Sequence, residues 1–122
     1  MGKKILIVDD SKFMRFRLKA CLHQAGLDTV EAKNGKEGLE QIPLETPDLI
    51  ISDVNMPVMD GPEFIRNVFR LYPDIPIIVL TANPDRELKF DFMSFNVRAF
   101  ISKLHPIEKI ADRVIQVLDR TG

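Results

Sequence analysis

The sequence has few of the features that mark secreted or membrane-spanning proteins. Cys21 is its single cysteine, which excludes an intramolecular disulfide and favours a reducing compartment. No apolar stretch reaches 18 residues, so no segment is predicted to span a membrane. The first apolar run, residues 5–8, is too short for the core of a signal peptide. We therefore expect a cytoplasmic protein with no membrane among its partners.

An excess of charge of one sign is also missing. Lysine and arginine number 17, aspartate and glutamate 18, and the net charge is −1. Nucleic acids and anionic membranes select strongly basic surfaces, so no nucleic-acid partner is expected. Repeats, low-complexity segments and linker-like stretches are absent too. The 122 residues are enough to bury a core, and residues 1–122 are predicted to form one domain.

Short apolar runs, with the length and β-branching of buried strands, alternate with segments of helical pattern. Strands are predicted at residues 5–8, 27–32, 48–53, 75–80 and 99–102. Helices are predicted at residues 12–25, 36–43, 62–72, 84–95 and from 106 onward. Ser11 is the expected cap of the first helix. The last helix has the clearest apolar stripe, formed by Ile107, Ile110, Ala111, Val114 and Leu118.

This fivefold alternation predicts an α/β fold. It indicates a five-stranded parallel sheet between two layers of helices, five helices in all, in a three-layer αβα arrangement. Right-handed crossovers leave few possible strand orders. Our first choice is the flavodoxin-like order 2-1-3-4-5, which puts the ends of the first and third strands side by side.

Acidic or polar side chains follow four of the five predicted strands. Asp9 and Asp10 follow the first strand, Asp53 ends the third, Thr81 follows the fourth and Lys103 the fifth. Open α/β sheets build their sites at the carboxyl ends of the strands, so we expect these five residues to converge.

Three adjacent carboxylates repel one another and need a cation, and carboxylate oxygens suit Mg²⁺. The metal and Lys103 together balance the three acids, so the site would hold an incoming phosphoryl group. Aspartate forms acyl phosphates. A metal neutralises the developing charge, while a lysine and a hydroxyl such as those of Lys103 and Thr81 bind phosphoryl oxygens.

Four motifs together resemble one known family. They are Asp9-Asp10, Asp53-Val-Asn-Met-Pro-Val-Met-Asp60-Gly61, Thr81-Ala82 and Phe100-Ile-Ser-Lys103. In order and spacing the whole chain resembles the receiver domain of two-component response regulators, and residues 9–15 are similar to its chemotaxis branch. The family has the strand order chosen above, so that choice is not independent of the resemblance.

The resemblance implies a phosphorylation-activated signalling switch. Asp53 would accept a phosphoryl group from a phosphohistidine on a sensor histidine kinase or a phosphotransfer protein. Asp10, Asp53 and the backbone carbonyl of Asn55 would bind Mg²⁺ directly, and Asp9 mainly through water. The domain would catalyse only its own phosphorylation and dephosphorylation, so it would not be an enzyme in the usual sense.

The resemblance also implies a route to an output partner. Thr81 and Lys103 would bind the phosphoryl oxygens, and the ring of Phe100 would turn inward when Thr81 moves. The surface of the last two helices and the fifth strand would then change and bind an output protein. We expect a stand-alone monomer, with phosphorylation-dependent dimerisation as the alternative.

Some positions depart from the family's usual pattern, and others have simple structural roles. In the family a proline usually follows the lysine, often through a cis bond. Leu104 stands here, and because a non-proline cis bond costs about 2.5–4 kcal/mol we expect a trans bond. Asn96 can take the left-handed conformation. A solvated basic face is predicted for the first helix, formed by Lys12, Arg15, Arg17 and Lys19.

Three other interpretations remain open at this point. The chain could be a fragment of a longer response regulator. A phosphohydrolase with an aspartyl nucleophile would normally have a second acid two residues after Asp53, where Asn55 stands. An FMN-binding protein would have a Ser/Thr/Gly-rich loop after the first strand, and that loop is acidic instead.

Overall fold

The described part of the chain folds as four helices and a five-stranded sheet. A computed structural model describes residues 2–54, 56, 58–82 and 95–121. The strands are β1 (Lys4–Val8), β2 (Asp28–Ala32), β3 (Leu49–Asp53), β4 (Ile77–Thr81) and β5 (Val97–Ser102). The helices are α1 (Lys12–Gln24), α2 (Gly35–Glu45), α3 (Gly61–Leu71) and α5 (Ile107–Thr121). The fourth helix, predicted at residues 84–95, falls almost entirely outside the described residues, and residue 95 itself lies in a turn.

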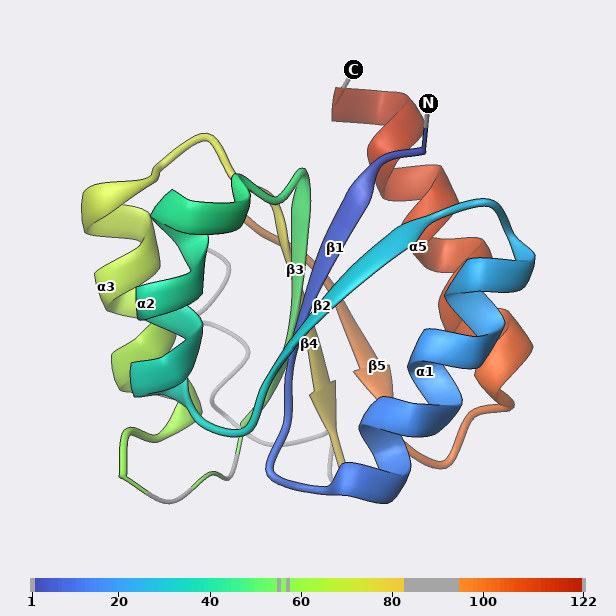
Figure 1. Cartoon of the computed structure of the whole chain (residues 1–122), viewed down its shortest axis with the longest axis horizontal. Helices are drawn as coiled ribbons and strands as arrows, with labels where there is room; N and C mark the ends of the chain where they lie inside the picture. Colours follow the sequence, from blue (N-terminus) through green and yellow to red (C-terminus); the bar gives the residue numbers. More distant parts are fainter. Residues whose placement is uncertain (1, 55, 57, 83–94, 122) are drawn as a thin grey trace.

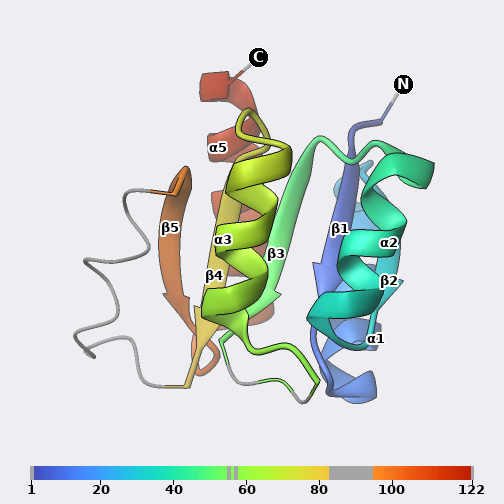
Figure 2. The same cartoon turned by 90° about the vertical axis from the view of Figure 1, so that its left-hand side faces the viewer.

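The sheet is parallel throughout, with the order β2-β1-β3-β4-β5. Helices α1 and α5 cover one face, and α2 and α3 cover the other (Figures 1 and 2). The predicted three-layer fold and strand order are therefore confirmed. The ladders pair Val8 with Ser52, Asp53 with Leu80, and Thr81 with Ser102, so the groups that follow these strands reach one edge of the sheet.

The sheet divides the apolar core in two. Ile5 and Ile7 of β1 pack toward α1 and α5, whereas Leu6 and Val8 pack toward α2 and α3. Strands β3 and β4 are buried along their whole length, as expected for parallel strands covered on both faces. Only alternate residues of β5 are buried.

Helix ends differ in detail from the predictions. Asn34 is the N-cap of α2, and its side-chain oxygen accepts a hydrogen bond from the Glu37 amide. The same helix does not stop at Pro43. It continues to Glu45, because the Thr46 amide still donates to the Ile42 carbonyl at 2.8 Å. Ser11 caps α1 as predicted, with its hydroxyl accepting from the Met14 amide.

Two backbone expectations are confirmed. No cis peptide bond occurs between residues that the structure describes, so the Lys103–Leu104 bond is trans. Asn96 has a φ of 60°, in the left-handed region. None of the helices described is long and apolar enough to cross a membrane.

Candidate functional site

Three carboxylates lie together where the sheet's strands end. Asp9, Asp10 and Asp53 each offer an oxygen, and these oxygens lie within 4.8 Å of one another. Asp9 and Asp53 are buried, with 1% and 5% of their surface exposed, while Asp10 is exposed. Buried carboxylates this close favour a nearby positive charge. The set therefore has the chemistry of a site for a hard cation.

The Asp53 side chain is held at both oxygens. Its Oδ1 accepts a hydrogen bond from the Val54 amide at 2.7 Å, and its Oδ2 lies 3.0 Å from the Lys103 ammonium. Ser52 donates its hydroxyl to the Asp53 carbonyl at 2.9 Å. The Gly61 amide donates to the Val54 carbonyl at 2.8 Å, which ties the start of α3 to the residue after Asp53. Asp53 is thus a rigidly placed carboxylate at the end of a buried strand.

Lys103 joins two of the acids. Its Nζ lies 3.0 Å from Asp53 Oδ2 and 3.1 Å from Asp9 Oδ2. Burial lowers the pKa of this amine, but the hydrogen bond to Asp53 and the charges of both acids outweigh it, so the pKa is raised above its ordinary value. Lys103 is therefore a cation at neutral pH. Its own amide donates to the Thr81 carbonyl at 2.9 Å, which ties the end of β5 to the end of β4.

Asp9 is fixed through most of its polar atoms. Its amide donates to the Ala32 carbonyl at 3.1 Å, and its Oδ1 accepts from the Ser11 amide at 2.8 Å. Its Oδ2 is fully buried and accepts no well-aligned hydrogen bond from the described residues, although Lys103 Nζ is at ion-pair distance. A buried carboxylate oxygen in this state can still accept from a metal-bound water. The cluster therefore fits a hydrated cation.

Comparison with known proteins gives the family. Residues 5–115 match the model of the response regulator receiver domain. The chain belongs to this family.

Full-length relatives agree with this assignment. The chemotaxis protein CheY of Thermotoga maritima is 34% identical over 123 aligned residues, which cover 100% of this chain and 99% of the relative. The sporulation initiation phosphotransferase F of Bacillus subtilis is 30% identical, over 97% of this chain and 95% of the relative. A crystal structure of CheY4 from Vibrio cholerae has a TM-score of 0.90 and 33% identity, covering 96% of this chain and 99% of that one. The resemblance inferred from the motifs is confirmed.

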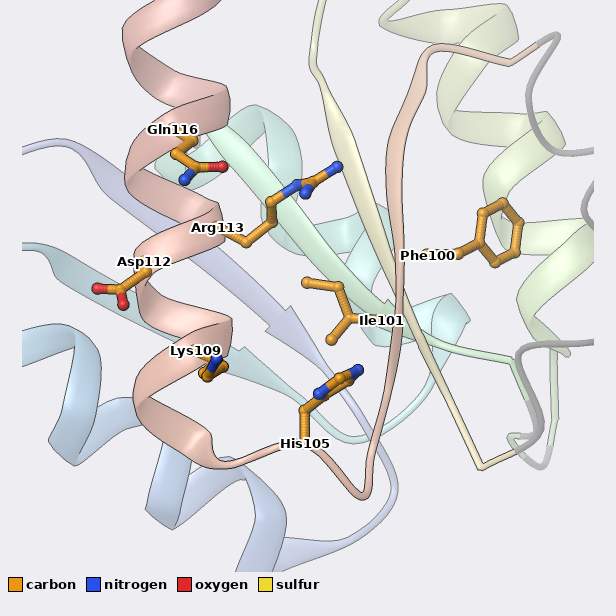
Figure 3. A pocket seen from close by; sticks show the side chains of 7 residues that line it. All are labelled: Phe100, Ile101, His105, Lys109, Asp112, Arg113 and Gln116. Carbon is orange, nitrogen blue, oxygen red and sulfur yellow. The ribbon is translucent and has the colours of Figure 1, made fainter.

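The two predicted switch residues of this receiver domain lie on adjacent strands. Thr81 ends β4 with 8% of its surface exposed. Phe100, on β5, is half-buried and packs toward the α2 and α3 side of the core. Figure 3 shows its ring on the side of β5 away from Ile101 and α5. Asn55, the predicted source of a metal-binding carbonyl, lies outside the described residues.

One prediction about the receiver's basic residues is wrong. Lys12, Arg17 and Lys19 are exposed as expected, but only 14% of the Arg15 side chain is. Its guanidinium donates from Nη1 to the Asp9 carbonyl and from Nε to Glu31 Oε1, the latter at 3.1 Å. The sequence feature that could have indicated this contact is Glu31, an acid within the strand that follows the first helix. Sequence spacing alone does not connect that acid to Arg15, because the contact is tertiary.

Cys21 and Ser52 are two further residues whose surroundings the structure defines. Cys21 is half-buried against Ile107, and burial followed by the charges of Glu108 and Asp112 raises the pKa of its thiol. A thiol with a raised pKa is less often in the reactive thiolate form. No role was predicted for Ser52, which is the one polar residue in an apolar run. Its hydroxyl nevertheless donates to the Asp53 carbonyl and so supports the backbone there.

Proposed function

We propose that this receiver domain is a phosphorylation-dependent signalling switch in which Asp53 accepts the phosphoryl group. One observation carries the proposal. The buried Asp53 carboxylate lies beside the acids of the β1–α1 loop and contacts the ammonium of Lys103. A nucleophilic carboxylate flanked by a cation site and a fixed ammonium is what phosphoryl transfer requires.

The proposed donor is a phosphohistidine on a sensor histidine kinase or a phosphotransfer protein. An Asp53 oxygen bonds to phosphorus as the donor's P–N bond breaks, and the imidazole leaves as a neutral group after protonation by solvent. The product is an acyl phosphate on Asp53. No general base is needed, because a carboxylate nucleophile, unlike a hydroxyl, has no proton to lose as it attacks. Lys103 and Thr81 then bind the phosphoryl oxygens.

We propose Mg²⁺ as the cofactor. Asp10 and Asp53 would bind it directly, together with the backbone carbonyl of Asn55, and Asp9 would act mainly through water. The grouping of the three acids and the buried Asp9 oxygen support this assignment. When bound, the ion supplies positive charge that neutralises the phosphoryl oxygens as charge develops on them.

The switch is proposed to act through β5. A phosphoryl group adds about −1.5 to −2 charge. It competes for Lys103, which now contacts Asp9 and Asp53, and it attracts Thr81. The Phe100 ring would then turn inward, changing the surface formed by β5 and the last two helices. An open groove of about 350 Å³ between β5 and α5 lies on this surface; Figure 3 shows the residues around it, among them His105 and Lys109.

We further propose that residues 1–122 act as a single receiver domain in the cytoplasm. It would be a monomer at rest and would catalyse only its own phosphorylation and dephosphorylation. Its partners would be the phosphodonor and an output protein.

The experiment is labelling with acetyl phosphate and Mg²⁺, followed by intact-mass analysis. We expect the wild type to gain the mass of one phosphoryl group and Asp53→Asn to gain none. Asp60→Asn is the matched control, because Asp60 is an acid in the same β3–α3 connection whose side chain caps α3. Labelling of Asp53→Asn to the wild-type extent would overturn the proposal, as would labelling that is unaffected by removing Mg²⁺ with a chelator.

A further inference from the structure

Arg15 contacts the backbone that carries the acid pair. Its Nη1 donates to the Asp9 carbonyl, and its Nε donates to Glu31 Oε1 at 3.1 Å. With 14% of its side chain exposed, the guanidinium is held between the β1–α1 loop and strand β2. A guanidinium has donors in a fixed planar fork, so one group binds both acceptors in a defined orientation.

The Asp9 carbonyl belongs to the peptide unit that joins Asp9 to Asp10. Other described contacts fix the Asp9 amide, to Ala32, and the Asp9 carboxylate, to Ser11 and Lys103. Among these contacts, the hydrogen bond from Arg15 to the Asp9 carbonyl is the one made to the peptide unit that leads into Asp10. That peptide is planar, so fixing its oxygen also fixes the direction in which the chain enters Asp10.

The charge of Arg15 is partly balanced by a neighbour. Glu31 pairs with it at 3.1 Å and also lies 3.8 Å from the Lys19 ammonium. A paired guanidinium changes the net field at the acid cluster less than a free one does. The geometry of Arg15 is therefore its main influence on the cluster.

We propose that Arg15 is a positioning residue for the metal site: it holds the Asp9–Asp10 peptide so that the Asp10 carboxylate stands beside Asp53. Glu31 of β2 in turn holds the guanidinium. This role rests on the proposed function, since it concerns the Mg²⁺ site assigned there. Groups that support metal ligands in this way change metal affinity by about 10- to 100-fold when they are replaced.

The test is isothermal titration of the whole protein with Mg²⁺. We expect Arg15→Gln to bind Mg²⁺ about tenfold more weakly than the wild type. Arg15→Lys should also bind more weakly, because an ammonium keeps the charge but lacks the planar fork. Arg17→Gln removes the same charge from the exposed side of α1 and should bind as the wild type does. Circular dichroism at the titration temperature shows that each variant is folded.

The outcomes separate the possible roles of Arg15. Tighter binding by Arg15→Gln, with Arg15→Lys equal to the wild type, would assign a purely electrostatic role and overturn the proposal. Unchanged affinity in both Arg15 variants, with a lower melting temperature, would assign a merely structural role and overturn it too. If the wild type itself does not bind Mg²⁺, the proposed metal site is overturned, and the role proposed for Arg15 is overturned with it.

Labelling by acetyl phosphate gives a second readout. We expect Arg15→Gln to need about tenfold more Mg²⁺ for half-maximal labelling rate, and to reach the wild-type rate at saturating Mg²⁺. A lower rate that saturating Mg²⁺ does not restore would contradict a positioning role at the metal site.

Discussion

The Lys103 ammonium contacts two buried carboxylates, one that follows β1 and one that ends β3. Lys103 is a cation that both acids contact, and its charge is kept by a raised pKa. The Lys103 side chain is 24% exposed, and the side chains of Asp9 and Asp53 are 2% and 7% exposed. Solvent therefore screens these ion pairs only in part. Lys103 therefore contributes to folding as well as to the proposed chemistry.

We predict that Lys103→Met lowers the free energy of unfolding in metal-free buffer by about 1–3 kcal/mol, because it leaves two buried carboxylates without their cation. The raised pKa makes this contribution fully present below the lysine's unfolded value, and it is lost as the pH rises through the folded value. The difference between wild type and variant should thus be constant from neutral pH to about 10.4 and shrink above it. Urea denaturation at a series of pH values measures it.

Lys109→Met is the matched control, because Lys109 is exposed on α5. A difference for Lys103→Met that stays constant well above the ordinary lysine pKa would show that the ammonium is not its source.

At the scale of elements, the approach of α3 to the end of β3 depends on Gly61. A Cβ built on Gly61 would lie 2.7 Å from the Asp53 carbonyl oxygen and 2.7 Å from Val54 Cα and its carbonyl oxygen. All three are backbone atoms, which cannot move aside as a side chain can. Helix α3 therefore begins directly against the strand that carries the acceptor.

We predict that Gly61→Ala destabilises the fold by about 1–3 kcal/mol through this overlap. It should also shift the amide resonances of Asp53 and Val54. Thermal unfolding and a ¹⁵N–¹H NMR spectrum measure the two effects. Glu63→Gln, in the same first turn but exposed, should leave both nearly unchanged. Unperturbed Asp53 and Val54 resonances in Gly61→Ala would contradict the proposed contact.

The elements themselves were largely predictable from sequence. The run of apolar, β-branched residues predicted β1 at residues 5–8, and the strand is Lys4–Val8. The predicted stripe of the last helix is buried at Ile110, Ala111, Val114 and Leu118. The prediction that α2 ends at Pro43 was wrong, because the helix continues to Glu45 although proline lacks an amide donor. Local sequence patterns therefore predicted which strands and helices form, but not the residues at which the helices end.

The gathering of the acids and Lys103 was predictable for a different reason. Strand ends in a parallel sheet meet at one edge, so Asp9, Asp53 and Lys103 could be placed together once the strand order was chosen. Arg15 could not, because its partners include Glu31, 16 positions away in sequence and reached only through packing of α1 on β2. The roles proposed for Asn55, Thr81 and Phe100 remain predictions.

In the molecule as a whole, the proposed metal site would link metal binding to folding. Without Mg²⁺ the three carboxylates have a single charge from Lys103 to offset their repulsion among the contacts described above, and an ion bound only by the folded state would stabilise that state. Mg²⁺ at 100 times its dissociation constant adds about 2.7 kcal/mol. For a domain of this size that corresponds to a rise in melting temperature of about 10 °C.

We predict this rise for the wild type and a much smaller one for Asp10→Asn, which loses a proposed ligand. Without metal, Asp10→Asn should melt above the wild type, because one repelling charge is gone. Differential scanning calorimetry with Mg²⁺ and with a chelator measures both effects. Asp74→Asn, at an exposed turn, is the control and should respond as the wild type does. An equal rise in Asp10→Asn and wild type would remove Asp10 from the metal site.

The direction of the strands has a practical consequence for building with this domain. In Figure 1 the start of β1 and the end of α5 lie at the edge of the sheet opposite to the one where Asp9, Asp53 and Lys103 gather. A fluorescent reporter or a second protein joined to either end is therefore attached on the side of the molecule away from the acids. Linkers there need only be long enough to clear α5 and β1, and they leave the approach to Asp53 open.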